Sequence, residues 1–241
     1  MRRIARGVAE RCPCCHLTPR WCVCAAQREI RCPLAIDVLM HRRERFRPTS
    51  TGNLIQRVLP ESRQHEWRRE RPPAIDDVRV PGRELWVLHP RGNPVPRGLA
   101  PEQVQVVLLD GAWSETTVMM QELARWGRVV SLPMTGESRF WLRAQQAGGR
   151  FCTVEALLFL LQMFGLAAAH EELRRQFELH VYASLRARGR KERAEEFLRD
   201  SPVPAAFPDL LAQLNVRRPM ALGGSEGKLL EVISALTWPA G

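Results

Sequence analysis

The chain has 241 residues, of which 45% are hydrophobic, and a formal net charge of +10 at pH 7. This length is sufficient for a sizeable hydrophobic core, and no apolar run approaches the ~20 residues that would cross a bilayer as a helix. Residues 1–6 include three arginines, and no apolar segment follows them. We therefore expect no signal peptide and a cytoplasmic location.

Arginine carries almost all of the positive charge, since Lys191 and Lys228 are the only lysines. A basic chain favours an anionic partner. The planar donor fork of arginine suits phosphate groups, and its flat face stacks on nucleobases. The alternative is a well-solvated surface without a specific partner. We expect contact with a nucleic acid.

Six of the seven cysteines lie within residues 12–32. Two close thiol pairs in this segment can surround one tetrahedral ion, as in structural zinc sites. Disulfides are the alternative, and the lack of a secretion signal disfavours them. Cys14, His16 and Cys32 are spare candidate ligands. The sequence therefore predicts a zinc-binding module over residues 1–32 whose ligands are Cys12, Cys15, Cys22 and Cys24.

A first buried strand is predicted over residues 34–40, and it leads into a loop with five Arg or His cations. The loop continues through small hydroxyl residues to Gly52, which begins a predicted helix through Val58. Hydroxyl groups and backbone N–H groups at the start of a helix can bind an anion or a carboxylate. The alternative is a solvated loop with ordinary caps.

Residues 61–83 are charged and rich in proline, which predicts an exposed connection. A second strand is predicted over residues 84–90. His89 at its end is either catalytic or a histidine with satisfied hydrogen bonds.

The third predicted strand, residues 104–110, is an apolar run that ends at Asp110 and leads into a helix over 114–126. In open α/β sheets, ligands lie beyond the carboxyl ends of the strands. An Asp at this position is well placed for chemistry, and the alternative is that it only caps the helix.

A short fourth strand is predicted over residues 128–133. Ser138–Arg143 then places two arginines four residues apart among aromatic residues. Such a pair could clamp a carboxylate or stack on bases, and the alternative is a semi-exposed helix with core aromatics. A further helix begins near Thr153 with Glu155 in its first turn.

Residues 170–199 are predicted to be helical, with a cationic run near the end that faces either solvent or RNA. Prolines interrupt the pattern after Ser201. The glycine-rich segment 223–227 predicts the start of a last short helix.

In this order and spacing, these motifs resemble the DTW-domain family, whose characterised members include tRNA-uridine aminocarboxypropyltransferases. The resemblance extends from the cysteine cluster to about Arg190. It rests on Cys12-x-x-Cys15 with Cys22-x-Cys24, Met40-His41-x-x-Glu44-x-x-Arg47-Pro48-Thr49-Ser50-Thr51-Gly52, Leu109-Asp110-Gly111-Ala112-Trp113, and Ser138-Arg139 with Thr153-Val154-Glu155-Ala156.

Two positions depart from the family pattern. Ala112 stands where the Asp-x-Thr-Trp motif has Thr, and Ser50 replaces the Asn of Thr-Asn-Thr-Gly. Both changes remove polar groups near the expected site, so they bear on rate or specificity more than on fold.

The resemblance implies an α/β fold related to the SPOUT methyltransferases, with or without a knot, over residues 33–200 and a C-terminal extension over 201–241. It implies transfer of the 3-amino-3-carboxypropyl group of S-adenosylmethionine to N3 of a uridine in tRNA or rRNA. Alternatives are S-adenosylmethionine-dependent methyl transfer to RNA and a non-enzymatic, zinc-containing RNA-binding protein.

The expected site gathers at the strand ends. Asp110 is the expected general base, and a positional role is the alternative. The residues expected to bind S-adenosylmethionine are Thr49, Ser50, Thr51, Gly52, Leu109, Trp113, Leu132, Ser138, Arg139, Arg143 and Thr153. Those expected to bind the RNA are His41, Arg42 and Arg47.

Overall fold

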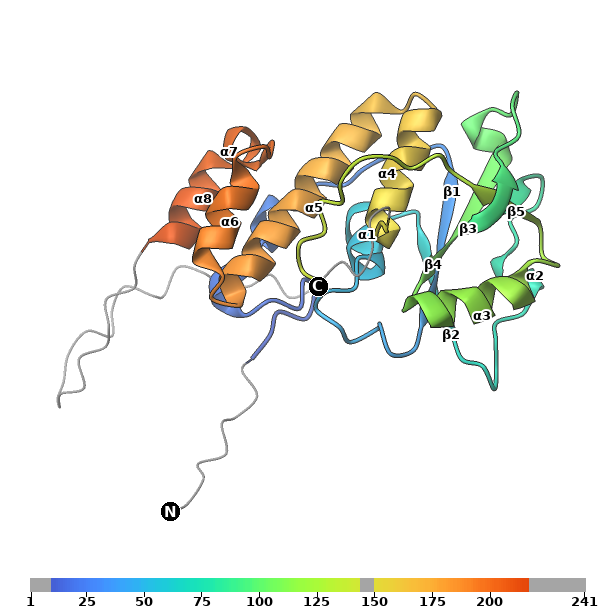
Figure 1. The fold of residues 1–241 in the computed structure, drawn as a ribbon, viewed down its shortest axis with the longest axis horizontal. Coiled ribbons are helices and arrows are strands. Elements are labelled where there is room, and N and C mark those ends of the chain that lie inside the picture. The colour runs from blue at the N-terminus through green and yellow to red at the C-terminus, as the bar shows by residue number, and fades with distance from the viewer. Residues whose placement is uncertain (1–9, 144–149, 217–241) are drawn as a thin grey trace, which may run out of the picture.

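The computed structural model describes residues 10–143 and 150–216 and is built on one parallel five-stranded sheet (Figure 1). The strand order is β2-β1-β4-β3-β5, and all neighbouring strands are parallel. The strands are β1 (Ala35–His41), β2 (Arg63–Trp67), β3 (Glu84–Pro94), β4 (Val104–Asp110) and β5 (Arg128–Ser131). The apolar runs of β1, β3 and β4 form the middle of the sheet because both of their faces are covered.

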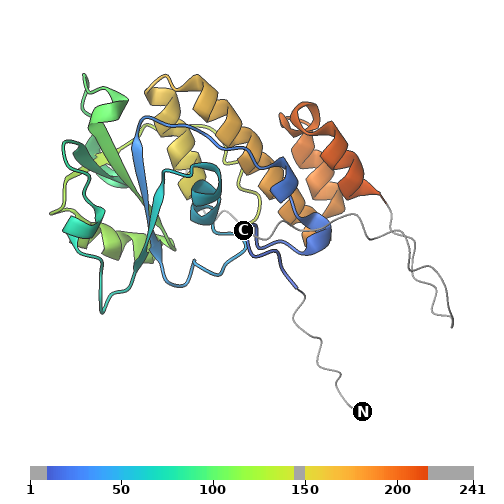
Figure 2. The same cartoon turned by 180° about the vertical axis from the view of Figure 1, so that it is seen from behind.

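The helices cover the two faces of the sheet unequally (Figures 1 and 2). α1, α4 and α5 contribute to the larger core on one face, whereas α2 and α3 pack on the other. The helices are α1 (Gly52–Val58), α2 (Ile75–Val78), α3 (Trp113–Leu123), α4 (Thr153–Met163), α5 (Ala167–Ala187), α6 (Lys191–Leu198), α7 (Val203–Ala206) and α8 (Pro208–Asn215), with short 3-10 turns η1 (Pro19–Trp21), η2 (Cys24–Ala26) and η3 (Pro101–Gln103).

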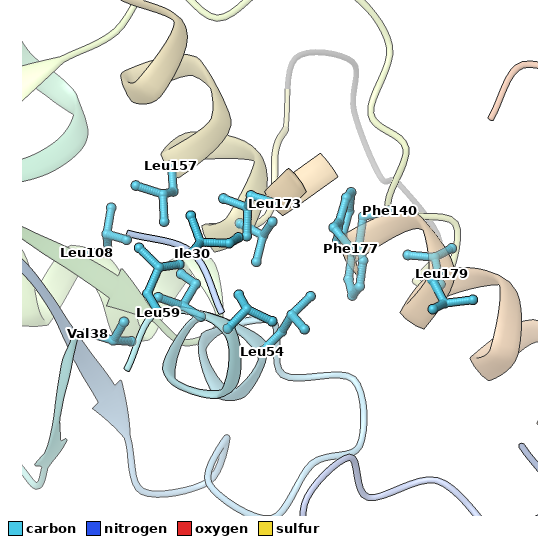
Figure 3. Packing of buried hydrophobic residues seen from close by; sticks show 14 of the residues in the cluster. Ile30, Val38, Leu54, Leu59, Leu108, Phe140, Leu157, Leu173, Phe177 and Leu179 are labelled. Carbon is cyan, nitrogen blue, oxygen red and sulfur yellow. The ribbon is translucent and has the colours of Figure 1, made fainter. Parts of the chain in front are cut away.

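Alternating strand residues divide the interior into two cores. Val38 and Leu108 face α1 and α4, where they join Leu54 and Leu157 (Figure 3). The intervening residues, such as Val107, face α3 on the other side of the sheet. The larger core continues along α5 and includes Leu214 of α8, so residues 203–215 pack on the same interior.

The predicted α/β architecture is confirmed, as are the expected strands and the main helices. The prediction that residues 61–83 form only an exposed connection is wrong, because this segment contains β2 and α2. β2 lies at the edge of the sheet and is mostly half-buried, so its sequence lacks an apolar run. No helix in the described part of the chain has the length and apolar character of a membrane span. The helix expected after segment 223–227 lies outside the described residues.

A buried polar network joins the three strands at one edge of the sheet. Asp37 of β1 has no exposed surface, and its carboxylate accepts hydrogen bonds from His65 Nε2 at 2.7 Å, Arg63 Nη2 at 3.0 Å and Gln105 Nε2 at 2.7 Å. Gln105 also donates to the carbonyl of Val78 in α2. Burial raises the pKa of Asp37, but these hydrogen bonds outweigh it, and the pKa lies below its ordinary value. The network stabilises the pairing of β2 with β1.

Replacing Asp37 should destabilise the fold in a pH-dependent way. Because Asp37→Ala leaves Arg63 and His65 without their anion, we expect a loss of about 3–5 kcal/mol in the free energy of unfolding at pH 7. A carboxylate with a lowered pKa stabilises the folded state above its unfolded pKa, and this contribution is lost as pH falls through the folded pKa. Urea unfolding at pH 7 and in acid should therefore show a smaller difference between variant and wild type in acid.

The exposed residue Asp76 of α2 provides the matched control. Asp76→Ala should change the free energy of unfolding by no more than about 0.5 kcal/mol. Equal stability of Asp37→Ala and the wild type at pH 7 would contradict the role of the network.

Candidate functional site

The site is centred on Asp110, the last residue of β4. Its side chain is buried, and each carboxylate oxygen accepts a hydrogen bond from a hydroxyl group. Ser50 Oγ donates to Oδ2 at 2.6 Å, and Thr153 Oγ1 donates to Oδ1 at 2.6 Å. Each oxygen keeps further acceptor capacity, because a carboxylate has about four lone-pair sites.

Two helices begin beside this carboxylate. Thr153 is the first residue of α4, and Ser50 lies two residues before α1. The first N–H groups of a helix have no partner within the helix, so both helices direct hydrogen-bond donors toward this end of the sheet. Successive strand residues alternate between the faces of a sheet, so Asp110 lies on the same face as Leu108, which is the face that α1 and α4 cover.

Gly52 lets the backbone of α1 approach Asp110. A Cβ atom at this position would lie 2.8 Å from Asp110 Oδ2 and 2.9 Å from Met40 Cε. Both distances are shorter than van der Waals contact, so a side chain at residue 52 would force the carboxylate, the Met40 methyl group or α1 to shift. The glycine of the loop motif is therefore required by this packing.

A cavity of about 420 Å³ opens at the carboxyl ends of β3 and β4. This volume is within the range of small-molecule sites. The wall combines apolar side chains with hydroxyl, carboxylate and guanidinium groups. Its lining residues are Thr49, Thr51, Leu88, His89, Pro90, Leu108, Leu109, Asp110, Gly111, Ala112, Trp113, Ser114, Thr116, Leu132, Met134, Ser138, Phe140, Arg143, Arg150, Phe151, Cys152, Thr153 and Ala156.

The structure brings most of the residues predicted to bind S-adenosylmethionine to this cavity. Ser50 and Gly52 do not line it; Ser50 donates a hydrogen bond to Asp110, and Gly52 lies next to the same carboxylate. Those on the wall are Thr49, Thr51, Leu109, Trp113, Leu132, Ser138, Arg143 and Thr153. Phe140 and Phe151 also line the wall, and no pattern in the sequence indicated this, because both lie in irregular segments without periodicity.

Arg139 is not among the lining residues. Its guanidinium group contacts Glu178 Oε2 at 3.1 Å and the carbonyl of Phe197 at 2.7 Å, and it lies 4.0 Å above the Phe197 ring. Glu178 is buried in α5 and requires a positive partner. The expected clamp of two arginines is therefore divided, and only Arg143 faces the cavity.

Buried carboxylates hold the segment 138–143 without a helix. Glu155 of α4 accepts hydrogen bonds from Ser138 Oγ at 2.9 Å and from the Arg139 N–H at 2.6 Å. Glu44 accepts from Arg143 Nη2 at 2.9 Å. These contacts position Ser138 and Arg143 on the cavity wall. They also explain why the helix considered for this segment is absent.

The three residues expected to bind RNA lie outside the cavity. His41 Nδ1 is 3.2 Å from Glu115 Oε1, and Glu115 also accepts from the Ala112 N–H at 2.8 Å. Arg47 pairs with Glu44, and Arg42 is exposed. Trp113, by contrast, lies on the wall with 44% of its surface exposed, and Arg150 lies 5.1 Å from its ring centre.

His89 lies on the cavity wall where β3 becomes irregular, since its pairing with β5 shifts between Leu88 and Asn93. His89 Nδ1 accepts the Arg91 N–H at 3.2 Å, whereas the buried Nε2 has no partner among the described residues. Burial lowers the pKa of His89, and Arg91 lowers it further. His89 is therefore neutral and only partly hydrogen-bonded within the described residues, which departs from the alternative of a histidine with satisfied hydrogen bonds.

The cysteine cluster has the geometry of a tetrahedral metal site. The sulfurs of Cys12, Cys15, Cys22 and Cys24 all lie within 4.8 Å of one another. The Cys12–Cys24 and Cys15–Cys22 sulfur distances are both 3.7 Å. Tetrahedral zinc with Zn–S bonds of about 2.3 Å has its sulfurs about 3.8 Å apart. The four residues therefore fit a zinc ion.

The four thiols also influence one another's ionisation. A hydrogen bond with Cys24 lowers the pKa of Cys15 to about 4, and the same contact raises the pKa of Cys24. Burial raises the pKa of Cys22 to about 11. Without a cation the cluster therefore favours a single thiolate, whereas a divalent ion stabilises several thiolates together. Of the spare candidates, Cys14 is exposed and contacts Gln27 instead.

A comparison with known protein families agrees with the family that the sequence motifs indicated. A family model described as DTW domain matches residues 9–185. The matched range covers more than two thirds of the chain and includes the four clustered cysteines, Asp110 and Thr153. No solved structure matches the chain.

Gly52→Ala should disturb the site by overpacking. The new Cβ would contact Asp110 and Met40, so we expect destabilisation by about 1–3 kcal/mol. Chemical unfolding measures this loss. Wild-type stability of Gly52→Ala would show that α1 can move away from Asp110 without cost.

The zinc assignment predicts different behaviour for neighbouring cysteines. Cys22→Ser removes one of the four sulfurs, so purified protein should contain less zinc and unfold at lower temperature. Cys14→Ser is the matched control and should leave both quantities unchanged, because Cys14 lies outside the cluster. Equal zinc loss in the two variants, measured by elemental analysis, would contradict the assignment.

Proposed function

Because the chain belongs to the DTW-domain family, we propose that it is an RNA-modifying transferase that transfers the 3-amino-3-carboxypropyl group of S-adenosylmethionine to N3 of a uridine in tRNA. The observation that carries this proposal is the Asp110 carboxylate at the wall of a small-molecule cavity, held by Ser50 and Thr153. The proposal includes the relation to the SPOUT methyltransferases and a cytoplasmic location.

The polar groups of the wall suit a zwitterionic donor. Asp110 forms no ion pair with any described residue, so its charge is available to the ammonium or sulfonium group of the donor. Arg143 and the Thr49 and Thr51 hydroxyls are suited to the donor carboxylate. Trp113 offers a partly exposed ring for stacking on adenine or uracil. Arg139 is left out of this proposal because it does not line the cavity.

The reaction requires a deprotonated nucleophile and a correctly presented carbon. Uridine N3 attacks the aminocarboxypropyl carbon bonded to sulfur, and a C–N bond forms. The C–S bond breaks, and its electron pair stays on the sulfur of the released methylthioadenosine. Asp110 accepts the N3 proton. Three carbons of the sulfonium can be attacked, so the position of the bound donor decides which group is transferred.

The clustered cysteines would hold a structural zinc ion. Four thiolates leave no open position for substrate, so the ion would cross-link the N-terminal segment and take no part in the transfer. Ile30 and Cys15 belong to the larger core, so this segment packs on the catalytic domain.

Asp110→Asn tests the proposed base. The variant should modify tRNA about 10²–10⁴-fold more slowly, because the amide cannot accept the N3 proton. Its residual rate should rise with pH, since hydroxide can remove the same proton. Mass spectrometry of digested tRNA incubated with S-adenosylmethionine provides the measurement. A wild-type rate would show that Asp110 is not the base.

The same spectra distinguish the proposal from its alternatives. Aminocarboxypropyl and methyl groups add different masses to the uridine, so a methylated product would contradict the proposed reaction. A protein that only binds RNA would show no affinity for S-adenosylmethionine in calorimetry. Asp76→Asn, an exposed change on α2, should leave the rate unchanged.

A further inference from the structure

The loop between β1 and α1 presents an aromatic side chain to solvent. Phe46 is 76% exposed, and Arg45 lies 5.6 Å from its ring centre. A single exposed aromatic residue needs no special explanation. The loop around Phe46, however, carries exposed arginines, and a groove lies beside the ring.

The loop is held so that its arginines face outward. Glu44, its one carboxylate, is fully buried and pairs with Arg47 and Arg143. Arg42, Arg45 and Phe46 are exposed on the outer side. Because the loop's own carboxylate is directed inward, its outer surface carries arginine side chains, of which Arg45 pairs with Glu66 Oε2 of β2 at 3.1 Å.

A groove of about 320 Å³ lies beside Phe46. One wall comes from the cysteine module through Pro13, Cys14 and His16. The other comes from Arg45 and Phe46 together with residues of α1 and β2, namely Asn53, Gln56, Arg57 and Gln64.

Hydrogen bonds fix the base of the groove. Asn53 Nδ2 donates to the Arg45 carbonyl at 3.1 Å, and Gln64 Nε2 donates to Asn53 Oδ1 at 3.1 Å. The backbone beneath Phe46 is therefore tied to α1 and β2. A stacking surface held in this way loses less conformational entropy on binding than a mobile loop would.

The groove and the cavity are connected through this loop. Thr49 and Thr51 line the cavity, and Phe46 is only three residues before Thr49. An extended chain spans at most about 3.6 Å per residue, so the Cα atoms of Phe46 and Thr49 are no more than about 11 Å apart. An RNA strand bound in the groove would therefore place its neighbouring nucleotides near the cavity and Asp110.

We propose that Phe46, Arg45 and Arg57 form a stacking site for an unpaired nucleotide of the RNA substrate. Aromatic rings stack on any base, and arginine adds cation–π and phosphate contacts. A net charge of +10 favours RNA over a neutral or basic protein partner. The inference rests on the proposed function, because it assigns part of the surface that holds the RNA.

Phe46→Ala tests this site in the full-length protein. Its affinity for a tRNA transcript should fall about 5- to 150-fold, and Phe46→Tyr should retain wild-type affinity. The slope of log affinity against log salt should not change for Phe46→Ala, because no charge is removed. Arg45→Ala should make that slope shallower by about 0.7–0.9. A 2-aminopurine base in a single-stranded RNA should be quenched by the wild type and not by Phe46→Ala.

Met163→Ala removes another exposed apolar side chain, on α4, and should leave tRNA affinity unchanged. Phe46→Ala should also bind S-adenosylmethionine normally, because the groove and the cavity have different linings. Wild-type tRNA affinity in Phe46→Ala would overturn the stacking site alone. A wild-type chain that binds no tRNA would overturn both this site and the proposed function.

Discussion

The contact between Asp110 and the two hydroxyls of Ser50 and Thr153 is the constraint on which the site depends. It joins the end of a central strand to the beginnings of α1 and α4, which are distant in sequence. A buried carboxylate is costly unless it is hydrogen-bonded, so these two contacts stabilise the arrangement of the three segments. Gly52 permits the approach, and the cavity opens beside it.

Buried glutamates hold other parts of the cavity wall in place through hydrogen bonds and ion pairs. Glu44 holds Arg143, while Glu155 holds the backbone and hydroxyl group at the start of segment 138–143. Glu178 draws Arg139 toward α5. Each buried carboxylate needs ion-pair or hydrogen-bond partners, and these contacts determine the positions of Arg139 and Arg143.

The β1–α1 loop serves two surfaces of the molecule. Its inward residues, Thr49 and Thr51, belong to the cavity, whereas Phe46 and Arg45 face the groove beside the cysteine module. Because Glu44 is buried, Arg45 and Phe46 next to it point toward the outer surface. The proposed transfer and the proposed RNA contact therefore share one structural element.

Local patterns in the sequence determined the α/β class with its buried strands, the position of Asp110 at a strand end and the four clustered cysteines. These features depend on apolar runs and short spacings, which are visible along the chain. Only the tertiary structure decided that Arg139 turns toward Glu178 and that His89 Nε2 lacks a partner within residues 10–143 and 150–216. It also revealed β2, whose place at the sheet edge leaves no apolar run. Such outcomes depend on which distant groups compete for the same charge or hydrogen bond, and spacing along the chain carries no information about that competition.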